Sequence, residues 1–242
     1  VASATLPAFV HLRVRSAYSL LQGALPIPQL AKLAVGNKFA AVALTDQNNL
    51  FGALEFSNKL ADTGIQPITG LTLTVDFGDT LADPAHASLR GADTKTVISG
   101  DIALLATSEE GYANLMKLGT EVFFDPALNE EPHVDVERLA EHAGGLIALT
   151  GGADGPIVRA LLEDRRAVAE ARLDRLSEIF GDRLYVEIQR HAMREERESE
   201  AALVQLAYVR NLPIVATNDC HFATPSDYEA HDALMCIAGG NY

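Results

Sequence analysis

The feature that most constrains the fold is a repeating order of short apolar runs and amphipathic segments along the chain. Seven runs of about four to eight residues are apolar at most positions and rich in β-branched side chains. The runs are 9–14, 40–44, 68–75, 102–106, 146–149, 184–188 and 214–216. Such runs are typical of parallel strands that are covered on both faces.

Amphipathic segments lie between these runs and after the last one, and they have the spacing of helices. The predicted helices are 27–35, 50–63, 111–123, 136–143, 155–179, 194–210 and 227–237. The alternation of the two kinds of segment predicts an α/β protein with about seven strands.

The domain organisation follows from length and from the position of the loops. A chain of 242 residues with 48% hydrophobic residues can bury one substantial core. Residues 77–100 are rich in Gly, Asp, Thr, Ala and Ser, and they predict a surface insertion between two strands. No linker is long enough to divide the chain, so we expect a single domain over 1–242. Because the chain starts at Val1 without an initiator Met, we interpret the chain as a trimmed piece of a longer protein.

The charge balance restricts the partners. The chain has 33 acidic and 19 basic residues, for a net charge of −14. A surface of this sign repels phosphate backbones, so we expect little direct binding of nucleic acid. No run of about 18 apolar residues is present, which argues against a membrane partner. Two cysteines make no disulfide framework, and we expect a cytoplasmic location.

The strongest chemical signal stands at the end of the last apolar run. In parallel β/α barrels, side chains from several strands converge at the carboxyl ends of the strands. Asp219 and His221 have the Asp-x-His spacing, which puts two metal ligands, or an acid–base pair, on one side of an extended turn. A hydrogen-bonded loop is the alternative. Further candidates to complete a metal site are His11, Asp46, Asp101 and His191.

The other candidate side chains favour ordinary roles. His86, His133 and His142 are predicted to be solvated, and His231 to have a packing or capping role. Cys220 is a poor candidate nucleophile beside His221, because adjacent residues of an extended chain point to opposite faces. The sequence contains neither a Gly-x-Ser-x-Gly elbow nor a P-loop.

Several segments together resemble one family. They read FVHLRVRSAYSLLQG at 9–23, AAVALTDQNNLFGALEF at 40–56, GIQPITGLTLTV at 64–75, EEGYANLMKL at 109–118 and IVATNDCHFATPSDYEAHDALMCIA at 214–238. In this order they resemble the PHP domains at the N-terminus of bacterial DNA polymerase III alpha subunits. The resemblance implies a distorted seven-stranded (β/α)7 PHP barrel. Where the family's site is intact, it implies a zinc or manganese cluster with phosphoesterase or 3′–5′ exonuclease activity.

The chain departs from the family at most of the metal-ligand positions. The replaced positions are Arg13, Arg15, Gln22, Gln47, Thr72, Asp101 and Gly152, whereas Asp219 and His221 stay as the family has them. The resemblance therefore implies a degenerate metal site, and we expect no cofactor; a single weakly bound zinc or manganese ion at Asp219 and His221 stays open.

The side chains of Arg13 and Arg15 are expected either to pair with carboxylates or to be exposed to solvent. We expect Arg13 and Arg15 to pair with Asp219, Asp101 or Asp46. The alternative is that both arginines reach solvent.

The sequence leaves a non-catalytic binding domain and a metal-dependent enzyme as the alternative functions. The leading hypothesis is a non-catalytic PHP domain that serves structure, contacts the other domains of the alpha subunit and binds the proofreading exonuclease subunit. The polymerase site of the family lies outside this chain, so whether the fragment is an enzyme stays open. The alternative is an active metal-dependent phosphoesterase or 3′–5′ exonuclease that uses His11, Asp46, Asp101 and His191. A histidinol-phosphatase-like enzyme is disfavoured, because its ligands are missing.

Overall fold

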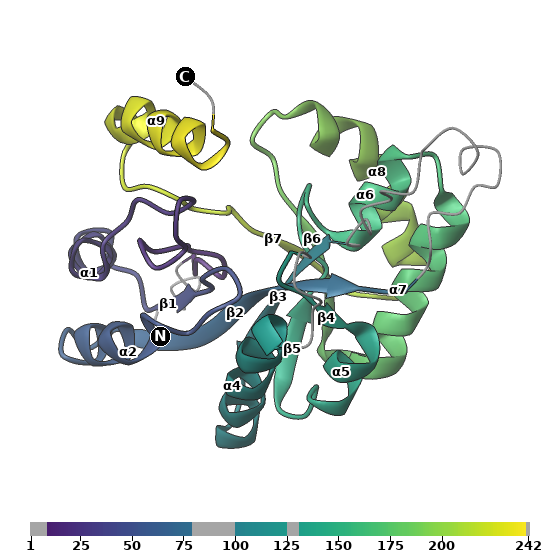
Figure 1. Ribbon diagram of the computed structural model, residues 1–242, viewed down its shortest axis with the longest axis horizontal. Coiled ribbons are helices and arrows are strands. Elements are labelled where there is room, and N and C mark those ends of the chain that lie inside the picture. Colours follow the sequence, from purple (N-terminus) through teal and green to yellow (C-terminus); the bar gives the residue numbers. More distant parts are fainter. Residues whose placement is uncertain (1–8, 79–99, 125–130, 241–242) are drawn as a thin grey trace, which may run out of the picture.

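The fold is built on one curled, mixed sheet with helices around it (Figure 1). A computed structural model describes residues 9–78, 100–124 and 131–240. Nearly all of the predicted insertion at 77–100 lies outside the described residues. Within them the strand order is β1-β2-β3-β5-β6-β7, and β4 pairs with β2 beside this path.

Six of the seven predicted runs are strands, and the two-residue strand β4 is a seventh strand that the sequence did not predict. The strands are β1 Ala41–Leu44, β2 Gln66–Asp76, β3 Gly100–Ala106, β4 Val134–Asp135, β5 Leu146–Leu149, β6 Leu184–Ile188 and β7 Ile214–Ala216. The prediction of parallel strands is wrong for β3, which is antiparallel to both β2 and β5. The apolar pattern does not reveal this, because a strand that is buried on both faces looks the same in either direction.

The first predicted strand, 9–14, forms isolated bridges instead. His11 bridges to Val42 in β1, and Val14 bridges to Cys220 beyond β7. The amide of Arg15 donates to the carbonyl of Cys220 at 2.9 Å. This extended segment therefore lies between the two edges of the sheet and links them near the carboxyl ends of the strands. The distorted barrel that the sequence predicts is confirmed, with bridges where one strand was expected.

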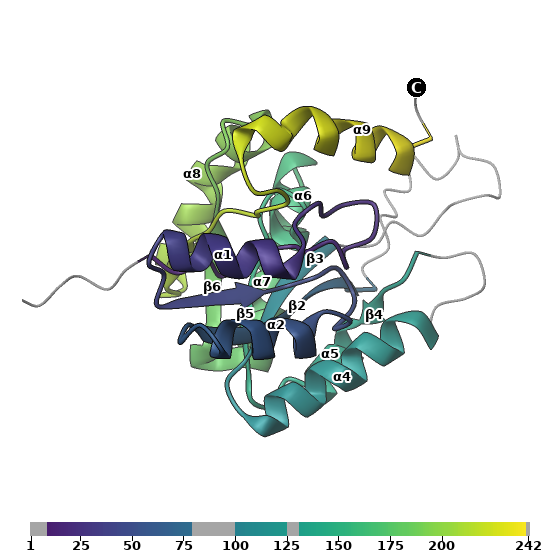
Figure 2. The ribbon, with the colours of Figure 1, turned by 90° about the vertical axis from the view of Figure 1, so that its left-hand side faces the viewer.

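The helices agree with the predicted segments apart from one. They are α1 Ile27–Gly36, α2 Ala53–Ala61, α4 Glu109–Phe124, α5 Val136–Glu141, α6 Pro156–Leu162, α7 Arg166–Phe180, α8 Arg194–Val209 and α9 Tyr228–Ala238 (Figure 2). The single helix predicted over 155–179 is wrong. Asp164 has φ 56°, which a right-handed helix does not allow, so the chain breaks between α6 and α7.

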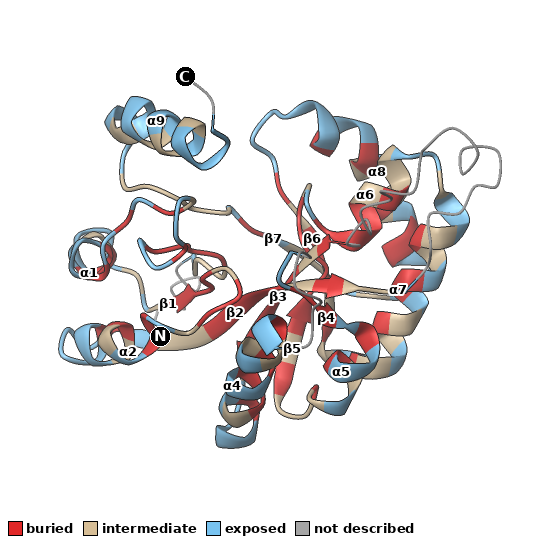
Figure 3. Ribbon diagram, in the orientation of Figure 1, coloured by how far each residue is buried: buried red, intermediate tan, exposed pale blue. Residues whose placement is uncertain are grey.

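The buried residues follow the sheet (Figure 3). The larger core cluster includes Leu71 on β2, Leu104 on β3 and Phe180 on α7, and a smaller cluster packs Phe56 and Leu60 of α2 near β1. Helix α9 differs, because none of its residues is buried. No helix in the described ranges has the length and apolar character needed to cross a membrane.

Candidate functional site

Two buried arginines hold one carboxylate at the carboxyl end of the sheet. Arg15 donates from Nε to Oδ1 of Asp219 at 3.2 Å and from Nη2 to Oδ2 at 3.2 Å, so the guanidinium and the carboxylate form a two-pronged pair. Arg13 donates from Nη2 to Oδ2 at 3.3 Å. Arg13 and Arg15 are 2% and 4% exposed. The predicted pairing with Asp219 is confirmed, and the alternative that the arginines reach solvent is wrong.

A second carboxylate, Glu187, completes the charge balance. Nη1 of Arg13 lies 3.5 Å from both carboxylate oxygens of Glu187, which is fully buried on β6. Thr217 and Gln189 also donate hydrogen bonds to Oε1 of Glu187. Sequence reasoning missed this residue, although a glutamate inside the apolar run 184–188 is itself a signal that a buried partner exists.

The pKa values of Asp219 and Arg13 are both shifted by the charges around them. Burial alone would raise the pKa of Asp219, but the charge of Arg13, the hydrogen bond from His221 and the charge of Arg15 outweigh it. The pKa of Asp219 is therefore held well below its usual value. For Arg13, burial lowers the pKa, and the charges of Glu187, Asp219 and Asp101 raise it by more. Arg13 and Asp219 therefore stay charged around neutral pH.

The two glutamines at replaced ligand positions bind Arg15. Its Nη1 donates to the side-chain oxygens of Gln22 and Gln47 at 2.6 and 2.5 Å. Gln47 donates in turn to Oγ1 of Thr74 at 2.9 Å, and Thr74 donates to Asp101 at 2.8 Å. Hydrogen bonds therefore connect Asp101 to Arg15, and at these positions amide groups contact guanidinium.

Two further replaced positions are filled by neighbouring protein groups. Thr72 is fully buried and donates from Oγ1 to the carbonyl of Thr45 at 2.8 Å. At Gly152, an added Cβ would lie 2.0 Å from Oε1 of Gln189. The space beside Gly152 is thus taken by the Gln189 side chain.

His221 faces two oxygens. Its Nδ1 lies 3.1 Å from the carbonyl oxygen of Gln22, and its Nε2 lies 3.4 Å from Oδ2 of Asp219. His231 on α9 contacts the same Gln22 carbonyl through Nε2 at 2.7 Å, in line with a packing or capping role. Both imidazoles therefore help to fix the Gln22 loop.

The other candidate ligands are not brought together. Asp46 accepts hydrogen bonds from the amide and hydroxyl of Ser16 and from the hydroxyl of Ser19, so the suggested pairing of Asp46 with an arginine is not found. Nδ1 of His191 lies 2.7 Å from Glu196 at the start of α8. Of the four candidates, Asp101 is connected to the guanidinium of Arg15 through the side chains of Thr74 and Gln47.

Arg13, Arg15, Glu187 and Asp219 together form what we call the arginine cluster. His11 and Cys220 face each other outside this cluster. Nδ1 of His11 lies 3.5 Å from Sγ of Cys220, and burial lowers the pKa of His11. Burial, followed by the charge of Asp219, raises the pKa of Cys220 to about 11. The thiol is protonated at neutral pH, which argues against a nucleophilic role.

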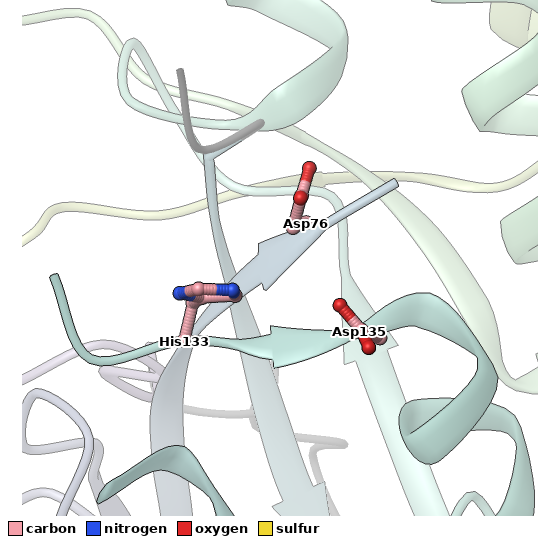
Figure 4. A group of neighbouring side chains, drawn as sticks. All are labelled: Asp76, His133 and Asp135. Atoms are coloured by element: carbon pink, nitrogen blue, oxygen red, sulfur yellow. The ribbon is translucent and has the colours of Figure 1, made fainter. Parts of the chain in front are cut away.

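A second group of ligand-type side chains was missed by sequence reasoning. One ligand atom from each of Asp76, His133 and Asp135 lies within 4.8 Å of the others (Figure 4). His133 is 8% exposed, so the prediction that it is solvated is wrong. The available signal was the His-x-Asp spacing of His133 and Asp135, which mirrors that of Asp219 and His221. Strand β4 has two residues, which is too short to show a periodic pattern in the sequence.

Comparison with known proteins identifies the family to which the chain belongs. Residues 11–191 match the PHP domain, and the chain belongs to the PHP domain family. The relatives include proteins named DNA polymerase III subunit alpha. The one from Caulobacter vibrioides is 44% identical over 97% of this chain and 20% of its own length, and the one from Rickettsia bellii is 38% identical over 96% and 18%. The chain thus spans about a fifth of the length of these curated relatives.

The likeness to solved structures is one of fold. A Bifidobacterium adolescentis protein described as a metal-dependent phosphoesterase superposes with a TM-score of 0.55 at 14% identity, over 91% of each chain. This degree of likeness supports the barrel architecture and carries no inference about chemistry.

Proposed function

We propose that this chain is the PHP domain of the alpha subunit of a bacterial replicative DNA polymerase, forming one domain over 1–242, and that it has a structural role in place of hydrolysis. The relatives named DNA polymerase III subunit alpha support the first part. The observation that carries the second part is the two-pronged hydrogen bonding of Arg15 to Asp219, with Arg13 on the same carboxylate.

The side chains do not fit the metal cluster that the family implies. Two guanidinium groups bind the retained carboxylate, and two more ligand positions carry amides that accept from Arg15. A dication placed at Asp219 would lie against both arginines in a poorly solvated site, where like charges repel strongly. No hydrolytic step is therefore assigned to this cluster.

The arginine cluster has a structural consequence instead. Arg13 lies on the segment that links the sheet edges, Glu187 lies on β6, and Asp219 follows β7. The ion pairs connect these elements across the carboxyl end of the barrel, where a metal would otherwise hold them. A rigid barrel of this kind suits a binding platform in the cytoplasm for the other domains of the polymerase subunit and for the proofreading exonuclease subunit.

One preparation tests this function with two readouts. The purified protein is expected to form a complex with the proofreading subunit on size-exclusion chromatography. With manganese, it is expected to hydrolyse bis-p-nitrophenyl phosphate no faster than an Asp219→Ala variant. Manganese-dependent hydrolysis that disappears in Asp219→Ala would establish the alternative function, a metal-dependent phosphoesterase. A folded protein that forms no complex would contradict the binding role.

A further inference from the structure

We propose that Asp76, His133 and Asp135 form a binding site for one divalent transition-metal ion of the zinc or manganese class. None of these residues belongs to the arginine cluster. Figure 4 shows their side chains at the neighbouring ends of β2 and β4. One ligand atom from each residue lies within 4.8 Å of the other two, so modest side-chain rotations would bring all three to the bond lengths of about 2.0–2.2 Å that zinc takes to nitrogen and oxygen.

The backbone fixes the grouping. Strands β2 and β4 are parallel, and the register pairs Val75 with Val134 and Asp76 with Asp135. Side chains of paired residues lie next to each other on the same face of a sheet. His133 and Asp135 are two residues apart in extended chain, so they also share a face. Three ligand-type side chains on one face thus follow from strand pairing.

The imidazole of His133 is oriented as a metal ligand. Its Nδ1 lies 2.8 Å from the carbonyl oxygen of Glu131. A carbonyl only accepts, so in the neutral ring Nδ1 carries the proton and Nε2 presents a lone pair. Histidines that bind metals usually donate their other nitrogen to such an oxygen. More than nine-tenths of His133 is buried, and in the described ranges no donor to Nε2 is found.

The carboxylates complete a suitable donor set. Oδ1 of Asp76 accepts a hydrogen bond from the amide of Gly78 at 3.1 Å, which holds this carboxylate in place. Asp135 is exposed, so an ion can enter from solvent. One imidazole and two carboxylates suit zinc or manganese, and three protein ligands leave coordination positions for water.

Metal titration of chelator-treated protein tests the site. We expect one equivalent of Co²⁺ to bind, seen by its visible absorption, and Zn²⁺ to displace it. His133→Asn keeps a donor near the position of Nδ1 and removes Nε2, and it is expected to weaken binding at least about tenfold. Asp135→Asn, at an exposed position, is expected to do the same. His142→Asn is the matched control, because His142 lies 3.3 Å from the single carboxylate of Glu121.

The outcomes separate this site from the arginine cluster. The proposal predicts that Asp219→Asn binds Co²⁺ as the unmodified protein does. Binding that survives both His133→Asn and Asp135→Asn would overturn it, as would the absence of stoichiometric binding. Binding lost in Asp219→Asn but kept in His133→Asn would also overturn it and would place the ion at Asp219. Circular dichroism confirms that each variant is folded, and Asp135→Asn decides if His133→Asn is not.

Discussion

Replacing Arg13 with methionine is expected to lower the free energy of unfolding by about 3–5 kcal/mol. The substitution keeps much of the side-chain volume and removes the guanidinium that faces Glu187 and Asp219. Glu187 is fully buried, so its charge would remain without a cationic partner within salt-bridge distance among the described residues. Urea denaturation at neutral pH, followed by circular dichroism, measures the change.

Arg194→Met is the matched control for this experiment. Arg194 pairs with Glu198 one helical turn away at 2.6 Å, but its side chain is 79% exposed. Exposed pairs of this kind contribute little to stability, because water screens the charges. If Arg13→Met cost no more than Arg194→Met, Arg13 would not be holding the carboxyl end of the barrel together.

Replacing Gly152 with alanine is expected to destabilise the protein by about 1–3 kcal/mol. The new Cβ would lie 2.0 Å from Oε1 of Gln189, so the amide must move. In its present position Gln189 donates to Oε1 of Glu187 at 3.0 Å and to Thr217 at 3.1 Å. Displacement removes a hydrogen bond from a buried carboxylate, and thermal or urea unfolding reports the loss.

A double-mutant cycle identifies the cause of this effect. In a Gln189→Ala background the obstructing amide is absent, so Gly152→Ala is expected to be close to neutral. Gly119 in α4, where an added Cβ meets nothing within 4 Å, is the control glycine. Gly119→Ala is expected to stabilise by roughly 0.5–1 kcal/mol, because alanine favours the helix. An equal cost for Gly152→Ala in both backgrounds would show that Gln189 is not responsible.

Short apolar runs in the sequence predicted most of the strands correctly. The apolar runs that became β1, β5 and β6 were visible in the sequence, because each is buried along most of its length. The run that became β7 was visible as well, although its three residues are half-buried or exposed. The segment 9–14 was misassigned because its pairing depends on Val42 and Cys220, which are distant in sequence. The break at Asp164 interrupts a continuous amphipathic pattern, since an aspartate tolerates the left-handed region better than most residues do.

The candidate site could be predicted from the sequence only in part. The resemblance placed Arg13 and Arg15 at ligand positions, and opposite charge then predicted pairing with Asp219, Asp101 or Asp46. Of these three carboxylates, Asp219 is the one that both arginines contact. Glu187 was missed because a fully buried partner inside a strand shows its role only once β6 is placed beside β7. His133 was missed because its burial and its neighbour Asp76 come from a strand pairing of two residues.

Diffraction data from crystals soaked in Mn²⁺, collected near the manganese absorption edge, test the central claim most directly. We predict no anomalous peak at Asp219, with the guanidinium groups of Arg13 and Arg15 in contact with its carboxylate. A peak at Asp76, His133 and Asp135 belongs to the second site and leaves this claim intact. A peak at coordination distance from Asp219, with the arginines turned away, would contradict the account.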